Sequence, residues 1–321
     1  MMTNVAISVF GLLLVGTVYR VATLRDWTSD LARKRLGSLL SWWIVATWVL
    51  LCAVGGTIIA SLLFATVSTL ALREYARLAF HHDDESGQPA VGHHFEDRTN
   101  ALPAMPIMVV GYVCIALLYA GLAAGADHTL LVCLPLACVI IAGSVLMATA
   151  STKHFTSNVG GIVYGVTLTG CLPAASVLLL PSDPTPSLAL PGWFLLLIGL
   201  TEVNDITAAW FGRALGRHKL APTLSPNKTF EGFIGGVLTT ITLATLLGPN
   251  ITDMSHATSS VFGLAIAIAG TLGDLNMSAI KRSAGVKDSG NVLPGQGGIL
   301  DRIDSLTFTA PVALLLMKVL S

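Results

Sequence analysis

The sequence predicts an all-α fold, a polytopic transmembrane helical bundle of about ten spans. Hydrophobic residues make up 53% of the 321 residues and charged residues only 11%, and the mean hydropathy is +0.74. Soluble domains carry about 25% charged residues, so a chain this apolar cannot cover a water-facing surface. Its apolar runs also approach the ~20 residues that a helix needs to cross a bilayer.

The spans follow from the apolar runs, taken in order along the chain. The run from residue 39 to 72 would overshoot the hydrocarbon core as one helix, so we divide it at Gly55 and Gly56. The first run has no basic residue before it and no small-residue cleavage site after it, which favours a retained span over a signal peptide. The predicted spans are residues 5–21, 38–55, 57–78, 104–124, 129–149, 159–181, 193–212, 233–249, 260–280 and 303–320.

The distribution of lysine and arginine among the loops predicts the orientation of these spans. Ten spans place alternate loops on opposite sides, and 17 of the 18 Lys and Arg residues then fall on one side, with Lys318 on the other. Cytoplasmic loops of membrane proteins carry such an excess of Lys and Arg. We therefore expect a multi-pass protein of the cell inner membrane with both termini outside and with these loops inside: 22–37, 79–103, 150–158, 213–232 and 281–302.

The chain divides into three parts of different character. Residues 1–100 hold N-terminal spans with inward basic and His/acid-rich loops, residues 101–200 hold the middle spans, and residues 201–321 form a C-terminal catalytic region with inward motif loops. In the first part, loop 81–98 interleaves four histidines with acids, which suits either a transition-metal site or a solvated loop.

Ionisable residues at membrane depth are the first sign of function. Glu202 and Asp205 lie three residues apart on one face of a predicted span, and Asp274 follows Gly273 in another. Charged groups are costly in the membrane and usually face the bundle interior or a wet cavity. Interior hydrogen bonding alone, or the ion path of a transporter, would also place acids here, although no internal repeat of the kind common in transporters is visible.

The inward loop 211–232 combines four cations and His218 with hydroxyl residues. Within it, the stretch SPNKT spaces Ser225, Lys228 and Thr229 at i, i+3 and i+4. This spacing is expected to bring two hydroxyls and an ammonium near one another, which suits phosphate binding. The GxxxxGK(S/T) spacing of a Walker A loop is absent. A solvated surface loop would explain the charges alone.

The stretch 273–305 carries the densest group of candidate residues. Asp301 and Asp304 lie three apart at the start of the last span, so both carboxylates project from one helix face and repel each other unless a cation lies between them. A hard divalent cation would resolve this repulsion, with Asp274 as a third ligand. Glycines just before the helix allow close backbone approach to a ligand, and the helix N-terminus favours anions. The cations available for phosphates are Lys281, Arg282, Lys287 and Arg302.

A purely structural reading of this stretch makes Asp301 a helix cap and Arg302 an interfacial anchor. It explains neither the glycines nor Asp274.

The segment SAIKRSAGVKDSGNVLPGQGGILDRID, residues 278–304, resembles the signature of the phosphatidate cytidylyltransferases, or CDP-diacylglycerol synthases. The loop GRHKLAPTLSPNKTFEGFIGG and the tripeptide Arg73-Glu74-Tyr75 are also similar to this family. The close likeness covers residues 200–315, and the N-terminal third is similar only in general character.

Two residues depart from the family pattern. Gln296 stands where the family usually has histidine, and glutamine cannot titrate. Met277 stands where it usually has glutamate, so one carboxylate near the expected metal site is lost.

The resemblance implies transfer of a cytidylyl group from CTP to phosphatidic acid, which yields CDP-diacylglycerol and pyrophosphate. It implies Mg²⁺ bound by Asp274, Asp301 and Asp304, a second cation such as K⁺, and Lys281 and Arg282 as further catalytic residues. Because the attacking phosphate is already an anion, catalysis would consist of positioning and charge neutralisation. The residues implied in substrate binding are Asp205, Ser225, Lys228, Thr229, Lys287, Asp288, Gln296 and Arg302.

Other functions stay open at this point. Another CTP-dependent lipid enzyme, such as a polyprenol kinase or a CDP-lipid synthase, would share the aspartates and differ in product. A non-catalytic paralogue is compatible with the two departures, whereas the retained aspartates and cations favour an active enzyme. The expected partners are CTP, phosphatidic acid and the lipid bilayer; a homodimer is compatible with the sequence, and no nucleic acid is expected.

Overall fold

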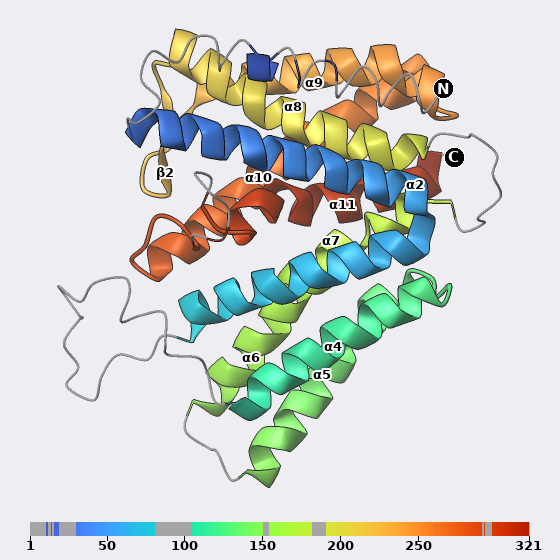
Figure 1. Cartoon of the computed structure of the whole chain (residues 1–321), viewed down its shortest axis with the longest axis vertical. Coiled ribbons are helices and arrows are strands. Elements are labelled where there is room, and N and C mark those ends of the chain that lie inside the picture. Colours follow the sequence, from blue (N-terminus) through green and yellow to red (C-terminus); the bar gives the residue numbers. More distant parts are fainter. Residues whose placement is uncertain are drawn as a thin grey trace.

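The computed structural model describes residues 11, 14, 16–18, 30–80, 105–149, 154–181, 191–290, 292 and 297–320. Helices dominate this part of the chain, and its one sheet is a two-stranded hairpin, so the predicted all-α fold is confirmed (Figure 1). The elements are α2 (Asp30–Ala79), α4 (Met105–Ala123), α5 (Thr129–Ala148), α6 (Phe155–Val166), the π-helix η1 (Thr167–Cys171), α7 (Leu172–Ala174), the 3₁₀-helix η2 (Val177–Leu179), α8 (Gly192–Leu215), β1 (Lys219–Ala221), β2 (Ser225–Thr229), α9 (Phe230–Ile251), α10 (His256–Ser283) and α11 (Leu300–Leu320).

Eight helical stretches in the described residues are long and apolar enough to cross a membrane. The predicted spans from 104–124 onward match these stretches to within a few residues at each end. Large apolar side chains such as Val54, Ile140 and Leu315 are more than 60% exposed on the outer surface. Such a surface suits lipid and not water, so the chain is a polytopic membrane protein. The predicted first span, 5–21, lies largely outside the described residues.

Helix α2 is two arms joined at a kink. Gly56 has φ 64° and ψ −161°, a conformation that glycine adopts readily because it lacks a Cβ. The second arm reverses direction at this point and diverges from the first, as the dark-blue and light-blue ribbons show (Figure 1). The predicted division of this stretch at Gly55 and Gly56 is therefore confirmed.

The helices that carry the motifs pack against one another in the upper half of the molecule in Figure 1. Helix α9 packs between α8 and α10, and α10 also packs along α11. Close approach of α8 and α9 depends on small residues, since a Cβ at Gly232 would lie 3.0 Å from the Cα of Gly212. The second arm of α2 packs instead with α4 and α6.

Several loops that were predicted to share one side of the membrane do lie at one end of the bundle. The end of α2, the β1–β2 hairpin, the end of α10 and the start of α11 gather at the left of Figure 1. Two long-range hydrogen bonds join them: Arg282 Nε donates to Leu224 O at 3.2 Å, and Ile299 N donates to Glu74 Oε1 at 3.0 Å. Loop 81–98 falls outside the described residues, so nothing here tests whether it is a transition-metal site or a solvated loop.

Candidate active site

The hairpin places a lysine beside the one acidic residue of helix α10. Its strands pair antiparallel, with Lys219 opposite Thr229. Lys228 forms an ion pair with the carboxylate of Asp274, and the two side chains are 24% and 27% exposed. Thr229 Oγ1 accepts a hydrogen bond from Gly232 N at 3.2 Å and so caps the start of α9.

The extended hairpin corrects the expected juxtaposition within SPNKT. Because side chains alternate along a strand and each residue rises ~3.3 Å, Ser225 and Thr229 lie about 13 Å apart at opposite ends of β2. Pro226 disfavours the α-helical backbone conformation at Ser225, the residue before it. Lys228 therefore reaches the acids, whereas Ser225 lies at the far end of the strand, beside Ala221.

Three aspartates from three helices form one electrostatic group. Asp205, Asp274 and Asp304 lie close enough for their charges to repel one another. The close packing of α10 on α11 brings two of them together, since a Cβ at Gly273 would lie 3.2 Å from the Cα of Ser305. Asp205 Oδ2 accepts a hydrogen bond from Ser305 Oγ at 2.7 Å.

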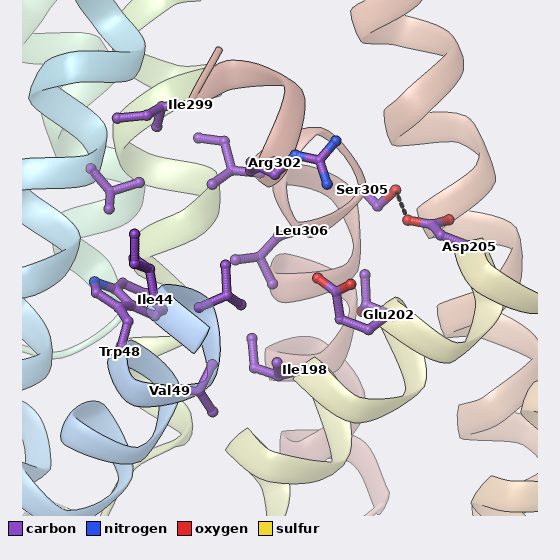
Figure 2. A pocket seen from close by; sticks show the side chains of 14 residues that line it. Ile44, Trp48, Val49, Ile198, Glu202, Asp205, Ile299, Arg302, Ser305 and Leu306 are labelled. Atoms are coloured by element: carbon purple, nitrogen blue, oxygen red, sulfur yellow. Dashed lines mark hydrogen bonds between the residues drawn. The ribbon is translucent and has the colours of Figure 1, made fainter. Parts of the chain in front are cut away.

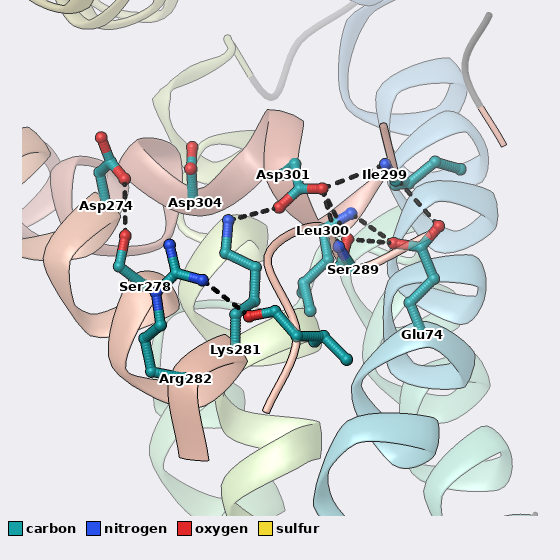
Figure 3. A network of polar contacts seen from close by, with 12 residues as sticks. Glu74, Asp274, Ser278, Lys281, Arg282, Ser289, Ile299, Leu300, Asp301 and Asp304 are labelled. Carbon is teal, nitrogen blue, oxygen red and sulfur yellow. Dashed lines mark hydrogen bonds and ion pairs between the residues drawn. The ribbon is translucent and has the colours of Figure 1, made fainter. Parts of the chain in front are cut away.

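Asp301 has a different environment from these three aspartates. Its Oδ1 accepts from Lys281 Nζ at 2.7 Å, and both side chains are largely buried, 9% and 13% exposed. Its Oδ2 accepts from Ser289 N, Ser289 Oγ and Gly298 N at 3.0 to 3.1 Å (Figure 3). Four donors thus occupy the carboxylate, about as many as its lone pairs can serve.

Glu74 belongs to this site, although no role was predicted for it from the sequence. It lies near the end of α2, is 2% exposed, and accepts hydrogen bonds from Ile299 N, Leu300 N and Ser289 Oγ (Figure 3). It therefore caps the start of α11 from a distant part of the chain. The one sequence signal was an acid at the inner end of an apolar span, within a tripeptide similar to the family's.

The other predicted residues are less closely bound to the aspartates. Arg282 is exposed and joins the hairpin to the turn after α10 through Leu224 O and Val286 O. Lys287 and Asp288 are exposed in that turn. Met277 is fully buried in the apolar core, and Gln296 lies outside the described residues.

The donor set suits a hard divalent cation bound partly by protein. Within the described ranges, no three His, Cys, Asp or Glu side chains converge as a ready-made metal site. Mg²⁺ needs no such cage, because it commonly binds one or two carboxylates and completes its shell with water and substrate phosphates. Asp274 and Asp304 offer such carboxylates, whereas Asp301 would first have to release Lys281.

Two pockets adjoin at Asp205. The first has a volume of about 590 Å³, which includes open solvent at its mouth. Its polar side is formed by Lys228, Asn227, Thr229 and Asp274. The second encloses about 930 Å³ on the same measure and is mostly apolar. Figure 2 shows its two sides, with Ile44, Trp48 and Val49 of α2 facing Glu202, Arg302 and the Asp205–Ser305 hydrogen bond.

Fold and site together define an integral membrane protein with a charged, glycine-lined site at one end of its helices. The model of the cytidylyltransferase family matches residues 37–320, which is most of the chain. The chain therefore belongs to the cytidylyltransferase family and is a nucleotidyltransferase.

Known relatives differ in how much of the chain they match. The uncharacterized protein YnbB of Escherichia coli (strain K12) is 35% identical over 274 residues, which cover 85% of this chain and 83% of YnbB. Phosphatidate cytidylyltransferases are 46% identical over 124 residues in Staphylococcus epidermidis (strain RP62A) and 42% identical over 132 residues in Thermotoga maritima. These matches cover 38% and 39% of this chain and 46% and 49% of the two enzymes, so the chain spans less than half of their length.

Proposed function

We propose that this protein transfers the cytidylyl group of CTP to phosphatidic acid. An oxygen of the lipid phosphate attacks the α-phosphorus of CTP, the bond from that phosphorus to the bridging oxygen breaks, and pyrophosphate leaves. The observation that carries this proposal is the pair of pockets that adjoin at Asp205: the first has Asn227, Lys228, Thr229 and Asp274 on one side, and the second is mostly apolar. A nucleotide and a lipid phosphate would meet where the two pockets adjoin.

The polar side of the first pocket suits the phosphates of CTP. Lys228 lies in its wall, and its ammonium is already engaged with an anion, the carboxylate of Asp274. A phosphate oxygen would replace or share that carboxylate as acceptor. Asn227 adds an amide that can donate to a phosphate or to the ribose.

The apolar pocket suits the glycerol backbone and the first part of the acyl chains. Its aliphatic and aromatic lining comes from α2, α8 and the start of α11, while Arg302 and Glu202 line its polar side (Figure 2). Arg302 is exposed, so its guanidinium is available to pair bidentately with a phosphate monoester. The carboxylates of Glu202 and Asp205 on that side oppose a bare anion, which is a reason to expect a metal ion beside the lipid phosphate.

Mg²⁺ would be held by Asp274 and Asp304, with Asp301 as a further ligand if Lys281 moves aside. When bound, the ion would supply charge stabilisation at the α-phosphate and on the departing pyrophosphate. The protein's part is to orient both phosphates and to neutralise charge through Lys228, Lys281 and Arg302. A second cation such as K⁺ remains part of the proposal by family resemblance.

We propose that the end of the bundle that carries the motifs faces the cytoplasm, with phosphatidic acid entering from the inner leaflet. The gathering of the motif loops at one end supports this orientation, because these loops hold much of the Lys and Arg. A cytoplasmic site is also where CTP is available. A homodimer is compatible with this arrangement.

The test is turnover of CTP by the purified protein in detergent–phosphatidate micelles. CTP labelled at the α-phosphate should give a labelled lipid, whereas CTP labelled at the γ-phosphate should give labelled pyrophosphate. A lipid kinase would instead transfer the γ-label to the lipid and leave the α-label in CDP, without forming pyrophosphate, and polyprenol offered as acceptor would reveal it. Lipid labelling should require Mg²⁺ and should be lost in Asp274→Asn and Asp304→Asn.

The matched control is Asp127→Asn, which alters an acid that accepts a hydrogen bond from Thr129 N at 2.9 Å at the start of α5. Its turnover should equal that of the unaltered protein. Gln296→His measures what that departure from the family pattern costs. If folded protein labels no lipid from α-labelled CTP, even as Gln296→His, cytidylyl transfer to phosphatidic acid is wrong.

A further inference from the structure

The carboxylate of Glu74 lies where the second arm of α2 meets the start of α11. Its Oε1 accepts from Ile299 N at 3.0 Å, and its Oε2 accepts from Leu300 N at 2.9 Å and from Ser289 Oγ at 3.0 Å. In the described part of the chain no Lys, Arg or His forms an ion pair with it. The charge of this buried acid is therefore met by backbone N–H groups at a helix N-terminus, where the helix dipole favours a negative charge.

Ser289 connects Glu74 to Asp301. Its hydroxyl lies 3.0 Å from Glu74 Oε2 and 3.0 Å from Asp301 Oδ2, although a hydroxyl has one hydrogen to donate. The two carboxylates therefore share this hydrogen, and a change at one alters the hydrogen bond to the other. Asp301 is held further by Gly298 N and by Lys281 Nζ (Figure 3). The network fixes the turn between α10 and α11 at both of its ends.

Two glycines of the turn leave room for Glu74. A Cβ at Gly298 would collide with Glu74 Oε2 and with Ser289 Oγ, and a Cβ at Gly290 would lie 2.8 Å from Glu74 Oε1. Neither glycine has a positive φ, so what these positions require is space and not an unusual backbone conformation. The backbone of the motif thus wraps closely around a carboxylate from the N-terminal half.

We propose that Glu74 is a positioning residue for the cytidylyl transfer proposed above, on which this inference rests. By fixing the start of α11, it sets the direction of the Asp301 carboxylate and, one helical turn later, of Asp304. Glu74 itself touches no substrate. The segment with the motifs, residues 200–315, then depends on one acid from outside it to hold its aspartates in place.

The experiment compares Glu74→Gln and Ser289→Ala with the unaltered protein and with Asp127→Asn as the matched control, an acid at the start of another helix. In Glu74→Gln one acceptor becomes an amide donor that faces a backbone N–H, while size and packing stay nearly constant. We expect kcat to fall about tenfold or more, with KM for phosphatidic acid changed less than about twofold, because ground-state binding is retained while transition-state positioning is lost. Asp127→Asn should change neither constant.

Two further readouts separate positioning from general destabilisation. Glu74→Gln combined with Ser289→Ala should lower kcat by less than the product of the single effects, because both act on one network. Hydrogen–deuterium exchange should rise in peptides covering residues 289–303 and stay unchanged in those covering α9, whatever the substrate.

The outcomes distinguish this inference from the proposed function. A folded Glu74→Gln protein with unaltered kcat overturns the inference, as does unaltered exchange at residues 289–303. If Glu74→Gln lowers the melting temperature and reduces exchange protection to the same extent in every helix, the role of Glu74 is purely structural. That result also overturns the inference. If the unaltered protein transfers no cytidylyl group, the proposed function fails, and faster exchange confined to residues 289–303 would still support the anchoring of α11 by Glu74.

Discussion

Alanine at Gly298 would test the close packing around the turn before α11. The added Cβ would collide with Glu74 Oε2 and Ser289 Oγ, while the N–H of residue 298 is needed by Asp301 Oδ2 at 3.1 Å. The φ of Gly298 is not positive, so the cost is steric. Overpacking by a methyl group in a closely packed region costs about 1–3 kcal/mol. If that energy displaces the turn, kcat falls between about fivefold and about 150-fold, because about 1.4 kcal/mol corresponds to a factor of ten.

The assay measures kcat for lipid labelling from α-labelled CTP together with the melting temperature in detergent. Gly199→Ala is the matched control, since Gly199 lies in α8 with no described atom within 4 Å of its added Cβ. There the same substitution should leave kcat unchanged and raise stability by about 0.5–1 kcal/mol, as expected for alanine in a helix. The reasoning is refuted if Gly298→Ala matches Gly199→Ala in both quantities.

Two other substitutions test the aspartate group and the hairpin. Asp205→Asn keeps an acceptor for Ser305 Oγ but removes one of three mutually repelling charges, so the melting temperature without Mg²⁺ should not fall. Mg²⁺ should raise the melting temperature of Asp205→Asn by less than it raises that of the unaltered protein. An equal rise in melting temperature would argue against Asp205 as part of the cation's environment. Thr229→Ala removes the cap that accepts from Gly232 N and should cost about 1 kcal/mol of stability, whereas Thr229→Ser should retain it. Equal melting temperatures for the two Thr229 variants would show that this cap contributes nothing.

The spans were predictable because the bilayer imposes a single length scale on them. Apolar runs of about 20 residues located the helices from 104–124 onward to within a few residues, and Gly55-Gly56 located the kink in α2. Lipid admits little besides helices, so hydropathy alone decides secondary structure inside it. In the hairpin, which lies beyond the apolar runs, this rule does not apply, and the expectation that both hydroxyls of SPNKT lie near its ammonium was wrong.

The sequence predicted many of the residues of the site, but it predicted fewer of the contacts that these residues make. Sequence spacing placed Asp301 and Asp304 on one helix, and the structure adds that they face different surroundings. Asp301 is met by four donors, whereas Asp304 faces the carboxylates of Asp205 and Asp274. Glu74 lies 215 or more residues before its partners, so no local pattern could link them. Such long-range contacts depend on how α2 packs, which the sequence of one chain does not reveal.

This division among the acids bears on the proposed Mg²⁺ site. Asp301 and Lys281 neutralise each other inside the protein, and Glu74 is compensated by helix N–H groups. The remaining group holds three carboxylates, and its ion pair in the described part of the chain is with Lys228 alone. With all three ionised, two negative charges are left over, which is the charge that one divalent cation carries. A site built only for stability would pair or remove these acids, because uncompensated charge at membrane depth is costly. Protonation of one or two of these acids would remove this surplus without a metal, and the proposed Mg²⁺ would remove it with all three ionised. In the second case Lys228 would be released to a phosphate of CTP.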